Sequence, residues 1–227
     1  DKPQIAGSDW WPHKLHGPDN NPVSEDTAFQ LPAIQQFRAM PMFNPAHGST
    51  VTLDGINIEI MDWEQTSFFV RRLCGRMYAR NIYNGRIIWQ DVAPYGLTTS
   101  LTTLVAADGF VCHATVGRAA VLRRELRTGT TLDPIELGGE DERVKWLAIV
   151  DGRLYALLGG VHSDDRPYTW FVPYPTDNYK EHKLHGRELV AYDLAAGEEL
   201  WRHRATAPID YRNVAIADNR LFYHGQD

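Results

Sequence analysis

Two copies of one pentapeptide carry residue types that suit a metal ion. The sequence His-Lys-Leu-His-Gly occupies residues 13–17 and occurs again at residues 182–186. Each copy supplies two imidazoles three residues apart, and four imidazoles together suit Zn²⁺, Cu²⁺ or a haem iron. A metal site requires that the two loops meet, and the alternative is two polar loops whose histidines are solvated or cap turns. The candidate ligands are His13, His16, His182 and His185.

A segment rich in aromatic residues and proline has the composition of a ligand-binding loop. Residues 166–175 read Arg-Pro-Tyr-Thr-Trp-Phe-Val-Pro-Tyr-Pro, inside a longer insertion at residues 161–186. Aromatic faces beside polar groups can stack a sugar ring or hold an extended peptide. An ordered cover that packs on the rim of the fold explains the same composition equally well. The candidate binding residues are Tyr168, Trp170, Phe171 and Tyr174.

Other residues able to bind a metal or change redox state form weaker patterns. Asp19, Asn20 and Asn21 offer several oxygens for Ca²⁺, although such clusters mostly form turns. Cys74 and Cys112 lie far apart in apolar runs, which favours two buried thiols over one disulfide and leaves their pairing open. The chain has no Cys-x-x-Cys pair, so a redox dithiol and a c-type haem lack support.

The elements that must position these residues form a repeat. Segments 79–89 and 191–201 follow the pattern Ala-x-Asp/Asn-x-x-x-Gly-x-x-x-Trp, and a third copy has Glu125 at the acid position and Asp133 in place of Trp. Each glycine lies between runs of strand formers, where a tight turn needs positive φ. The acid or amide can accept backbone N–H bonds across the turn, and the tryptophan can fill the space between neighbouring sheets. The repeat residues are Asn81, Gly85, Trp89, Glu125, Gly129, Asp193, Gly197 and Trp201.

A second turn precedes each of these hairpins. Asp-Gly or Asp-Asn pairs start at residues 54, 108, 151 and 218, each between two short apolar runs, and they lie 54, 43 and 67 residues apart. Each unit therefore contains four antiparallel strands, with a period of about 44 residues and one insertion. Four strands in ~40–45 residues are typical of a β-propeller blade. The sequence predicts an all-β fold of four-stranded antiparallel blades.

This repeat resembles the PQQ-like repeat of quinoprotein-type propellers, which also forms non-enzymatic propellers such as the outer-membrane assembly lipoprotein BamB. The opening segment, residues 9–24, with its Asp-Trp-Trp-Pro-His start, is similar to the PQQ-binding-like repeat proteins of planctomycete-type bacteria. The resemblance implies a propeller that closes with seven or eight blades, in an exported, periplasmic or cell-surface bacterial protein. About three and a half blades are present, and each blade depends on its neighbours. We therefore expect the chain to be the N-terminal part of a longer propeller.

The expected organisation follows from these spacings. An N-terminal segment packs on the propeller, three complete blades follow, the third carries the insertion, and a truncated blade begins at the end. The expected ranges are 1–50 for the N-terminal segment, 51–93, 94–138 and 139–206 for the blades, with the insertion at 161–186, and 207–227 for the start of a further blade.

Composition narrows the classes of function. The net charge is −6 and the pI about 5.8, so the chain lacks the basic surface that nucleic acid requires. No stretch approaches the ~20 apolar residues of a membrane helix. With 7 Trp, 10 Tyr and 8 Phe along its length, the chain has enough apolar material to fold.

The predicted function is a non-catalytic binding or scaffold module. PQQ dehydrogenases, which share only the repeat, carry adjacent cysteines over the cofactor and hold Ca²⁺ with Glu, Asn and Asp ligands, and this chain has no adjacent cysteines. We therefore expect no cofactor, with PQQ implied by the resemblance alone. The expected partners are a protein, peptide or glycan ligand and the remaining blades of the same chain. The alternative is the N-terminal part of a quinoprotein-like oxidoreductase, and whether a catalytic domain follows stays open.

Overall fold

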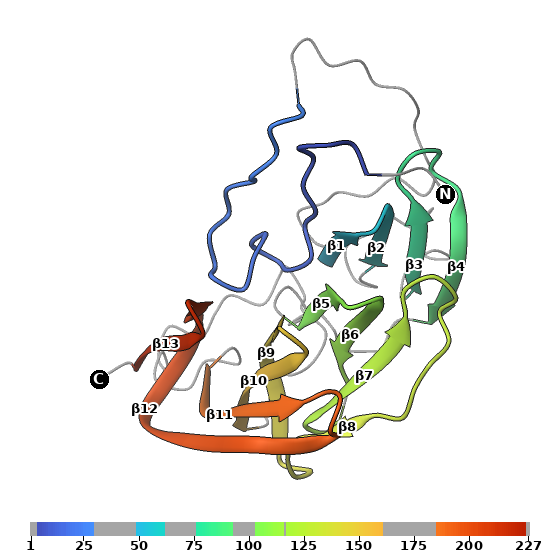
Figure 1. The fold of residues 1–227 in the computed structure, drawn as a ribbon. Helices are drawn as coiled ribbons and strands as arrows, with labels where there is room; N and C mark the ends of the chain where they lie inside the picture. The colour runs from blue at the N-terminus through green and yellow to red at the C-terminus, as the bar shows by residue number, and fades with distance from the viewer. Residues whose placement is uncertain are drawn as a thin grey trace, which may run out of the picture.

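The computed structural model describes residues 4–29, 49–61, 76–92, 103–115, 117–160 and 185–225 of the chain. Within these ranges every regular element is a β-strand, and the strands form three antiparallel sheets (Figure 1). The predicted all-β fold is confirmed. None of the described residues belongs to a helix long and apolar enough to cross a membrane.

The strands follow one another within each sheet in chain order. Sheet 1 contains β1 (Ser49–Leu53), β2 (Ile56–Met61), β3 (Arg76–Asn81) and β4 (Ile87–Val92). Sheet 2 contains β5 (Leu104–Ala107), β6 (Phe110–Ala114), β7 (Ala120–Glu125) and β8 (Ile135–Glu136). Sheet 3 contains β9 (Glu142–Val150), β10 (Arg153–Gly160), β11 (His185–Asp193), β12 (Glu198–Ala217) and β13 (Arg220–Gly225).

Two-residue turns join the first two strands of each unit. In all four turns both central residues have positive φ, between 49° and 78°. This backbone is the type I′ turn, whose twist matches that of antiparallel strands and which favours Asp-Gly and Asn-Gly pairs. The turns are Asp54-Gly55, Asp108-Gly109, Asp151-Gly152 and Asp218-Asn219.

In the first and third sheets the acid or amide that starts the second hairpin accepts backbone N–H groups, whereas Glu125 of the second sheet accepts the Thr128 hydroxyl at 2.6 Å. The side-chain oxygen of Asp193 accepts the N–H groups of Ala195 and Ala196, both at 2.8 Å. Asn81 accepts the N–H groups of Tyr83 and Asn84 in the same way. These bonds satisfy backbone donors that the turn removes from the ladder, and the two N–H donors, that of Ala196 foremost, lower the pKa of Asp193.

One hydrogen bond ties the two turns of each unit together. The residue after the acid position donates its N–H to the glycine carbonyl of the preceding two-residue turn. The pairs are Ile82 to Gly55 at 3.1 Å, Leu126 to Gly109 at 2.8 Å and Leu194 to Gly152 at 3.0 Å. Because the same bond recurs in all three sheets, the sequence repeat is also a repeat of structure.

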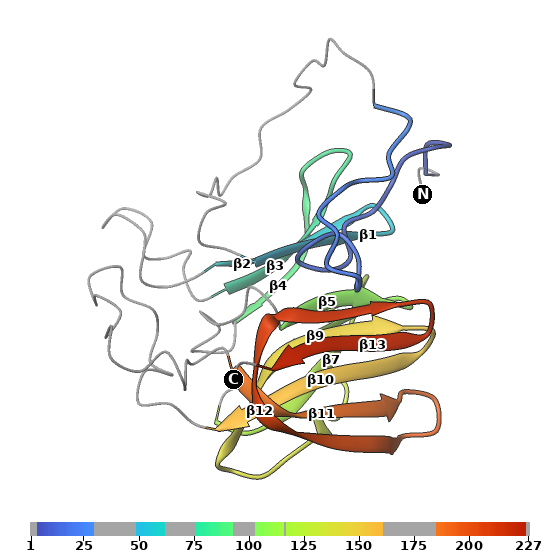
Figure 2. The same ribbon diagram turned by 90° about the vertical axis from the view of Figure 1, so that its left-hand side faces the viewer.

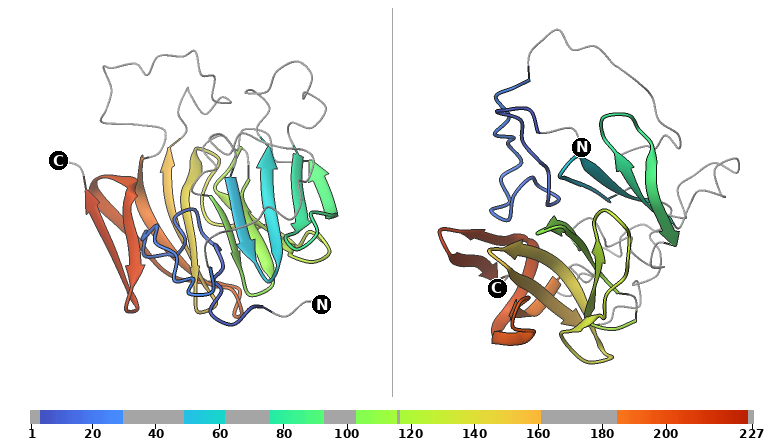
Figure 3. Two further views of the ribbon diagram at one scale, coloured as in Figure 1. Left: turned by 90° about the horizontal axis from the view of Figure 1, so that it is seen from above. Right: turned by 45° about the vertical axis from the view of Figure 1, so that its right-hand side comes forward.

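The sheets pack face to face in chain order around three apolar cores. One core lies between sheets 1 and 2, a second between sheets 2 and 3, and a third between β9–β11 and the end of β12 with β13. β9 is buried on both faces, since Leu147 faces the second core and Trp146 the third. Each such side chain contributes roughly 1.5–3 kcal/mol on burial. Figures 2 and 3 show the sheets following one another, as consecutive blades of a partial β-propeller.

A tryptophan of sheet 1 locks onto the neighbouring sheet. The Nε1–H of Trp89 donates to the carbonyl of Leu126 at 2.9 Å, and its ring lies against Gly129, where an added Cβ would be only 2.7 Å from the ring. Trp201 holds the same place in the repeat but is 40% exposed and faces Tyr155 of its own sheet, with ring centroids 6.2 Å apart.

The long strand β12 belongs to two layers. Its first part pairs with β11, from Glu198 to Asp210, and its last part pairs with β13, from Ile209 to Ala217. The register shifts between Ile209 and Val214, so the strand leaves one sheet there and starts the hairpin that covers the third core. The spacing of the sequence repeat predicts that a blade ends at residue 206. In the structure β12 continues through this position to Ala217.

Candidate binding site

An N-terminal strap, residues 9–21, crosses the first strand of each unit (Figure 1). It supplies one hydrogen-bond acceptor to the residue that lies two positions before each type I′ turn. The bonds are Thr52 N to Trp11 O at 2.7 Å, Ala106 N to Pro12 O at 2.9 Å, Ile149 N to His13 Nε2 at 3.2 Å and Ile216 N to Pro18 O at 2.8 Å. Edge strands leave such N–H groups unpaired, so the strap completes four sheet edges.

Asp9 holds the start of the strap in shape. Its carboxylate accepts the N–H groups of Trp10 at 2.7 Å and Glu25 at 2.8 Å, and it pairs with His16 Nε2 at 2.5 Å. Although desolvation raises the pKa of Asp9, these hydrogen bonds outweigh it and the pKa is lowered. The ring of Trp11 packs edge-on against His16, with centroids 5.1 Å apart. The strap is thus a defined loop rather than a loose tail.

His13 is the one buried titratable side chain of the strap. It is 7% exposed, and its Nε2 accepts the Ile149 amide, which favours a neutral ring with the proton on Nδ1. Burial lowers its pKa to about 4. Among the described residues Nδ1 has no hydrogen-bond partner, so this N–H is a buried donor without an acceptor.

Lys14 and Arg212 place two cations beside one aromatic ring. The Lys14 ammonium lies 5.2 Å from the ring centroid of Tyr211, and the Arg212 guanidinium lies 6.0 Å from the same centroid. Burial lowers the pKa of Lys14, and repulsion by Arg212 lowers it further. In the part of the chain that the structure describes, no carboxylate pairs with Lys14.

Asp210 fixes Arg212 and lies next to His185. It is 2% exposed and accepts the backbone N–H and the guanidinium of Arg212. Burial raises the pKa of Asp210, but the bonds from Arg212 outweigh it, so the pKa is lowered. His185 Nε2 lies 3.5 Å from Asp210 Oδ2. The charge of Arg212 is therefore balanced locally, whereas that of Lys14 is not.

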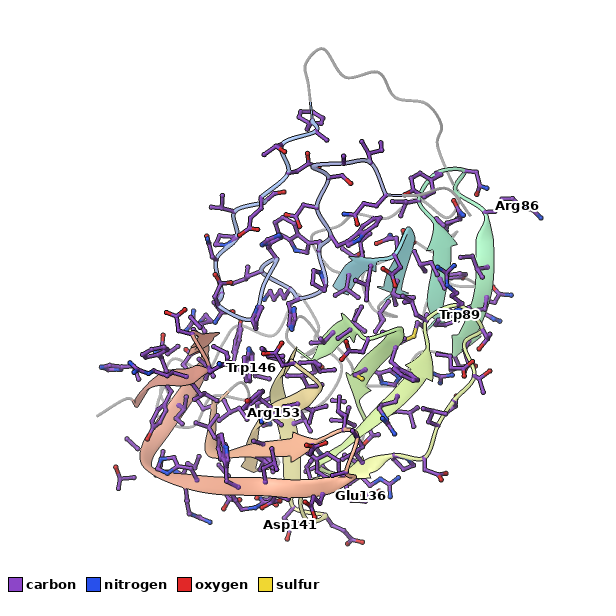
Figure 4. The ribbon with its side chains drawn as sticks, in the orientation of Figure 1. Arg86, Trp89, Glu136, Asp141, Trp146 and Arg153 are labelled. Atoms are coloured by element: carbon purple, nitrogen blue, oxygen red, sulfur yellow. The ribbon has the colours of Figure 1, made fainter. Side chains whose placement is uncertain are left out.

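These residues meet around a cavity between the strap and β12. Its volume is about 20 Å³, and its walls include His13, Lys14, Tyr211 and Arg212. Trp146 of β9, which is labelled in Figure 4, forms an apolar side of the cavity. No Asp or Glu among the described residues lines it. A cavity that has two cations and a buried N–H donor in its walls, and no acid, is suited to an anion.

The predicted histidine ligands lie in separate environments. His13 bonds to Ile149, His16 to Asp9 and His185 to the buried Asp210, while His182 lies outside the described residues. Among the residues that the structure describes, no three His, Cys, Asp or Glu side chains are placed to hold a metal ion. The strap and the third sheet are nevertheless neighbours, because Asn20 Nδ2 donates to the Val214 carbonyl.

The other predicted site residues have varied outcomes. The aromatic loop residues Tyr168, Trp170, Phe171 and Tyr174 lie outside the described ranges, as does Cys74. Cys112 is fully buried, which raises its pKa to about 12. Asp19 forms an ordinary turn, with Oδ1 accepting the Asn21 N–H at 3.2 Å.

Sequence reasoning missed Lys14, Tyr211 and Arg212. Lys14 lies between the two histidines of the first pentapeptide. The sequence pattern therefore identifies its segment as a candidate site, but it assigns no role to the lysine charge. Tyr211 and Arg212 lie in the stretch of β12 where the register shifts, and no motif identifies them. Only the fold brings them to the strap.

The described residues do not bring together the groups that the resemblance associates with PQQ. In the dehydrogenases that share the repeat, these groups are adjacent cysteines and a set of oxygen ligands for Ca²⁺. The two cysteines, Cys74 and Cys112, are far apart in sequence, Cys112 lies in an apolar core, and no acidic cluster of three is present among the described residues.

Comparison with known proteins identifies a similar fold. No family model and no curated protein matches the sequence. Solved structures with similar folds include the quinohemoprotein alcohol dehydrogenase of Comamonas testosteroni (16% identity, TM-score 0.42, 69% of this chain and 20% of that chain), BamB of Moraxella catarrhalis (13%, 0.31, 79% and 76%) and the Pan2 WD40 domain of Neurospora crassa (13%, 0.41, 71% and 40%). The chain thus spans a fifth of the dehydrogenase. These similarities concern the fold alone.

Proposed function

We propose that this chain is part of a non-catalytic propeller that serves as a binding or scaffold module in an exported bacterial protein. The observation that carries the proposal is the cavity between the strap and β12, with Lys14 half-buried in its wall and no acid beside it. Strands and a strap tied to four sheet edges form a rigid frame, and rigid frames are where binding groups are best positioned.

The chemistry of this cavity favours binding over catalysis. His13 has its Nε2 committed to the Ile149 amide, and its pKa of about 4 leaves it neutral at pH 7. A general base needs a free lone pair and a pKa near the working pH. Lys14 and Arg212 act as fixed charges beside Tyr211. The groups at this site can therefore orient and hold a ligand.

The ligand and the partners belong to the same proposal. The cavity is too small for a whole ligand, so a protein, peptide or glycan would place one group in it and extend over the neighbouring surface. The aromatic loop with Tyr168, Trp170, Phe171 and Tyr174 is a second candidate contact, and the remaining blades of the same chain are the expected neighbours of sheet 3.

The test uses the full-length protein purified from its native host. Metal analysis by mass spectrometry is combined with an absorbance scan for quinone and haem. We expect a colourless protein without stoichiometric metal. A quinone band with one Ca²⁺ per chain would contradict the proposal and make the protein a quinoprotein-like oxidoreductase. Zinc, copper or haem that disappears in His16→Ala and His185→Ala would instead establish the paired-histidine metal site.

A further inference from the structure

We propose that the cavity between the strap and β12 binds a single carboxylate group, held by the Lys14 ammonium, the Nδ1–H of His13 and the positive edge of Arg212. This inference rests on the proposed binding function and names the chemistry of the ligand. The carboxylate belongs either to a small acid or to a peptide.

The charges of Lys14 and Arg212 favour an anionic ligand. Lys14 and Arg212 flank Tyr211 at 5.2 Å and 6.0 Å from the ring centroid, and Asp210 neutralises Arg212 alone. Half-buried cations without a counter-ion are costly, and a bound anion removes that cost. Asp19 acts on His13 electrostatically, but no acid among the described residues lines the walls or pairs with Lys14, so the charge of Lys14 is left for a monovalent anion to balance.

A hydrogen bond from His13 would orient the bound anion. The ring of His13 is 7% exposed and its Nδ1 has no acceptor within the described part of the chain. A buried donor without an acceptor costs free energy comparable to a lost hydrogen bond. A carboxylate has two oxygens, so one can accept from His13 Nδ1–H while the other contacts Lys14.

The size of the cavity favours a small anionic group over a larger anion. The cavity has a volume of about 20 Å³, and a cavity of roughly 10–15 Å³ holds one water molecule. The space therefore suits the two oxygens of a carboxylate better than the four oxygens of a phosphate. The rest of the ligand must lie outside, along the strap.

The experiment titrates the full chain with sodium acetate at constant ionic strength and pH 7, and follows the indole N–H of Trp146 and the ring of Tyr211 by NMR. We expect a saturable shift with acetate in the millimolar range, no saturable shift with the neutral isostere acetamide, and weaker binding of inorganic phosphate. Tighter binding of N-acetyl-glycylglycine than of acetate assigns the site to a peptide carboxylate, and weaker binding assigns it to a small acid.

Matched variants distinguish the effect of the site from the effect of the net charge of the chain. Lys14→Met should weaken acetate binding about tenfold or more, and Lys14→Arg should restore it to within about threefold. Arg86→Met removes the same charge from an exposed residue at the far edge of sheet 1 (Figure 4) and should leave binding unchanged. Equal losses in Lys14→Met and Arg86→Met, absence of saturation, or tighter binding of phosphate would overturn the proposal. A quinone band in a protein that still binds acetate would contradict the proposed function and leave the carboxylate site standing.

Discussion

Two histidines are neutral because the fold hides them from water. His13 in the strap and His113 in β6 are 7% and 0% exposed, and burial lowers the pKa of each to about 4. His113 Nδ1 contacts the Ala114 carbonyl at 3.0 Å, and its Nε2 has no partner among the described residues. Protonating either ring would place a charge in a buried setting, so both tie the stability of the fold to pH.

We expect the free energy of unfolding to fall as the pH drops from about 6.5 to 4. The unfolded chain takes up these protons near pH 6.5 and the folded chain only near pH 4, so the unfolded state gains protons first and is favoured in this window. Each histidine contributes about 3 kcal/mol over the whole window. Urea unfolding at pH 7 and pH 5 measures the effect.

The variants His13→Gln and His113→Gln provide the control for this pH dependence. Glutamine keeps an acceptor for the Ile149 amide but does not titrate. Each variant should lose about half of the decrease in stability between pH 7 and pH 5. If the decrease is the same in both variants as in the unchanged chain, the two histidines do not cause it.

At the scale of elements, a turn of one sheet contacts a side chain of the preceding sheet. Trp89 of β4 reaches across to sheet 2, where its N–H bonds to Leu126 and its ring covers Gly129. The second repeat has Asp133 at the tryptophan position, and there Arg202 of β12 donates to the Leu137 carbonyl at 2.6 Å. Neighbouring sheets are thus joined by polar bonds as well as by their cores.

Gly129→Ala should destabilise the fold more than Gly152→Ala. Both glycines have positive φ, 75° and 72°, which costs an alanine about 1–2 kcal/mol. Only Gly129 faces the Trp89 ring, since an added Cβ at Gly152 meets nothing within 4 Å. Loss of the tryptophan contact adds about 2 kcal/mol or more. Urea unfolding of the two variants measures the difference.

A double variant isolates the contact. In a Trp89→Ala background the extra cost of Gly129→Ala should vanish, because the ring that the new methyl group displaces is absent. If the two glycine variants are equally stable in the unchanged chain, the ring does not depend on this glycine.

The hairpins could be predicted from the sequence, whereas the cavity could not. A type I′ turn depends on two adjacent residues such as Asp151 and Gly152, so its signal is local. The strap site joins Lys14 to Tyr211, and these residues share no motif. The aromatic insertion and the paired histidines attracted attention by composition, but composition does not report distance. The site is a product of topology, which joins residues far apart in the chain.

At the scale of the whole molecule, the strap links the first strands of successive sheets, in addition to the cores and polar bonds between those sheets. Its acceptors bond to equivalent residues of four first strands, from Thr52 to Ile216. Each bond closes an edge that another chain could otherwise extend. The strap therefore contributes both cohesion between blades and protection of the edges.

Amide hydrogen exchange tests this role. In the full chain we expect slow exchange at the N–H groups that the strap covers, which are those of Thr52, Ala106, Ile149 and Ile216. Removing residues 1–21 should speed each of them about tenfold or more, since a covered N–H loses its acceptor. Ala156, in β10 between β9 and β11, should be unaffected. Faster exchange at Ala156 to the same degree would mean that the chain opens as a whole.

The order of the strap's contacts has a consequence for how the chain is made. Trp11, Pro12, His13 and Pro18 meet the first, second, third and fourth units in the same order in which a ribosome delivers them. The strap is made before the sheets, so it can form one bond with each newly completed hairpin, without being threaded through structure already in place. The last of these bonds needs Ile216, so the strap can be fully bound only after the first strand of the fourth unit has been synthesised.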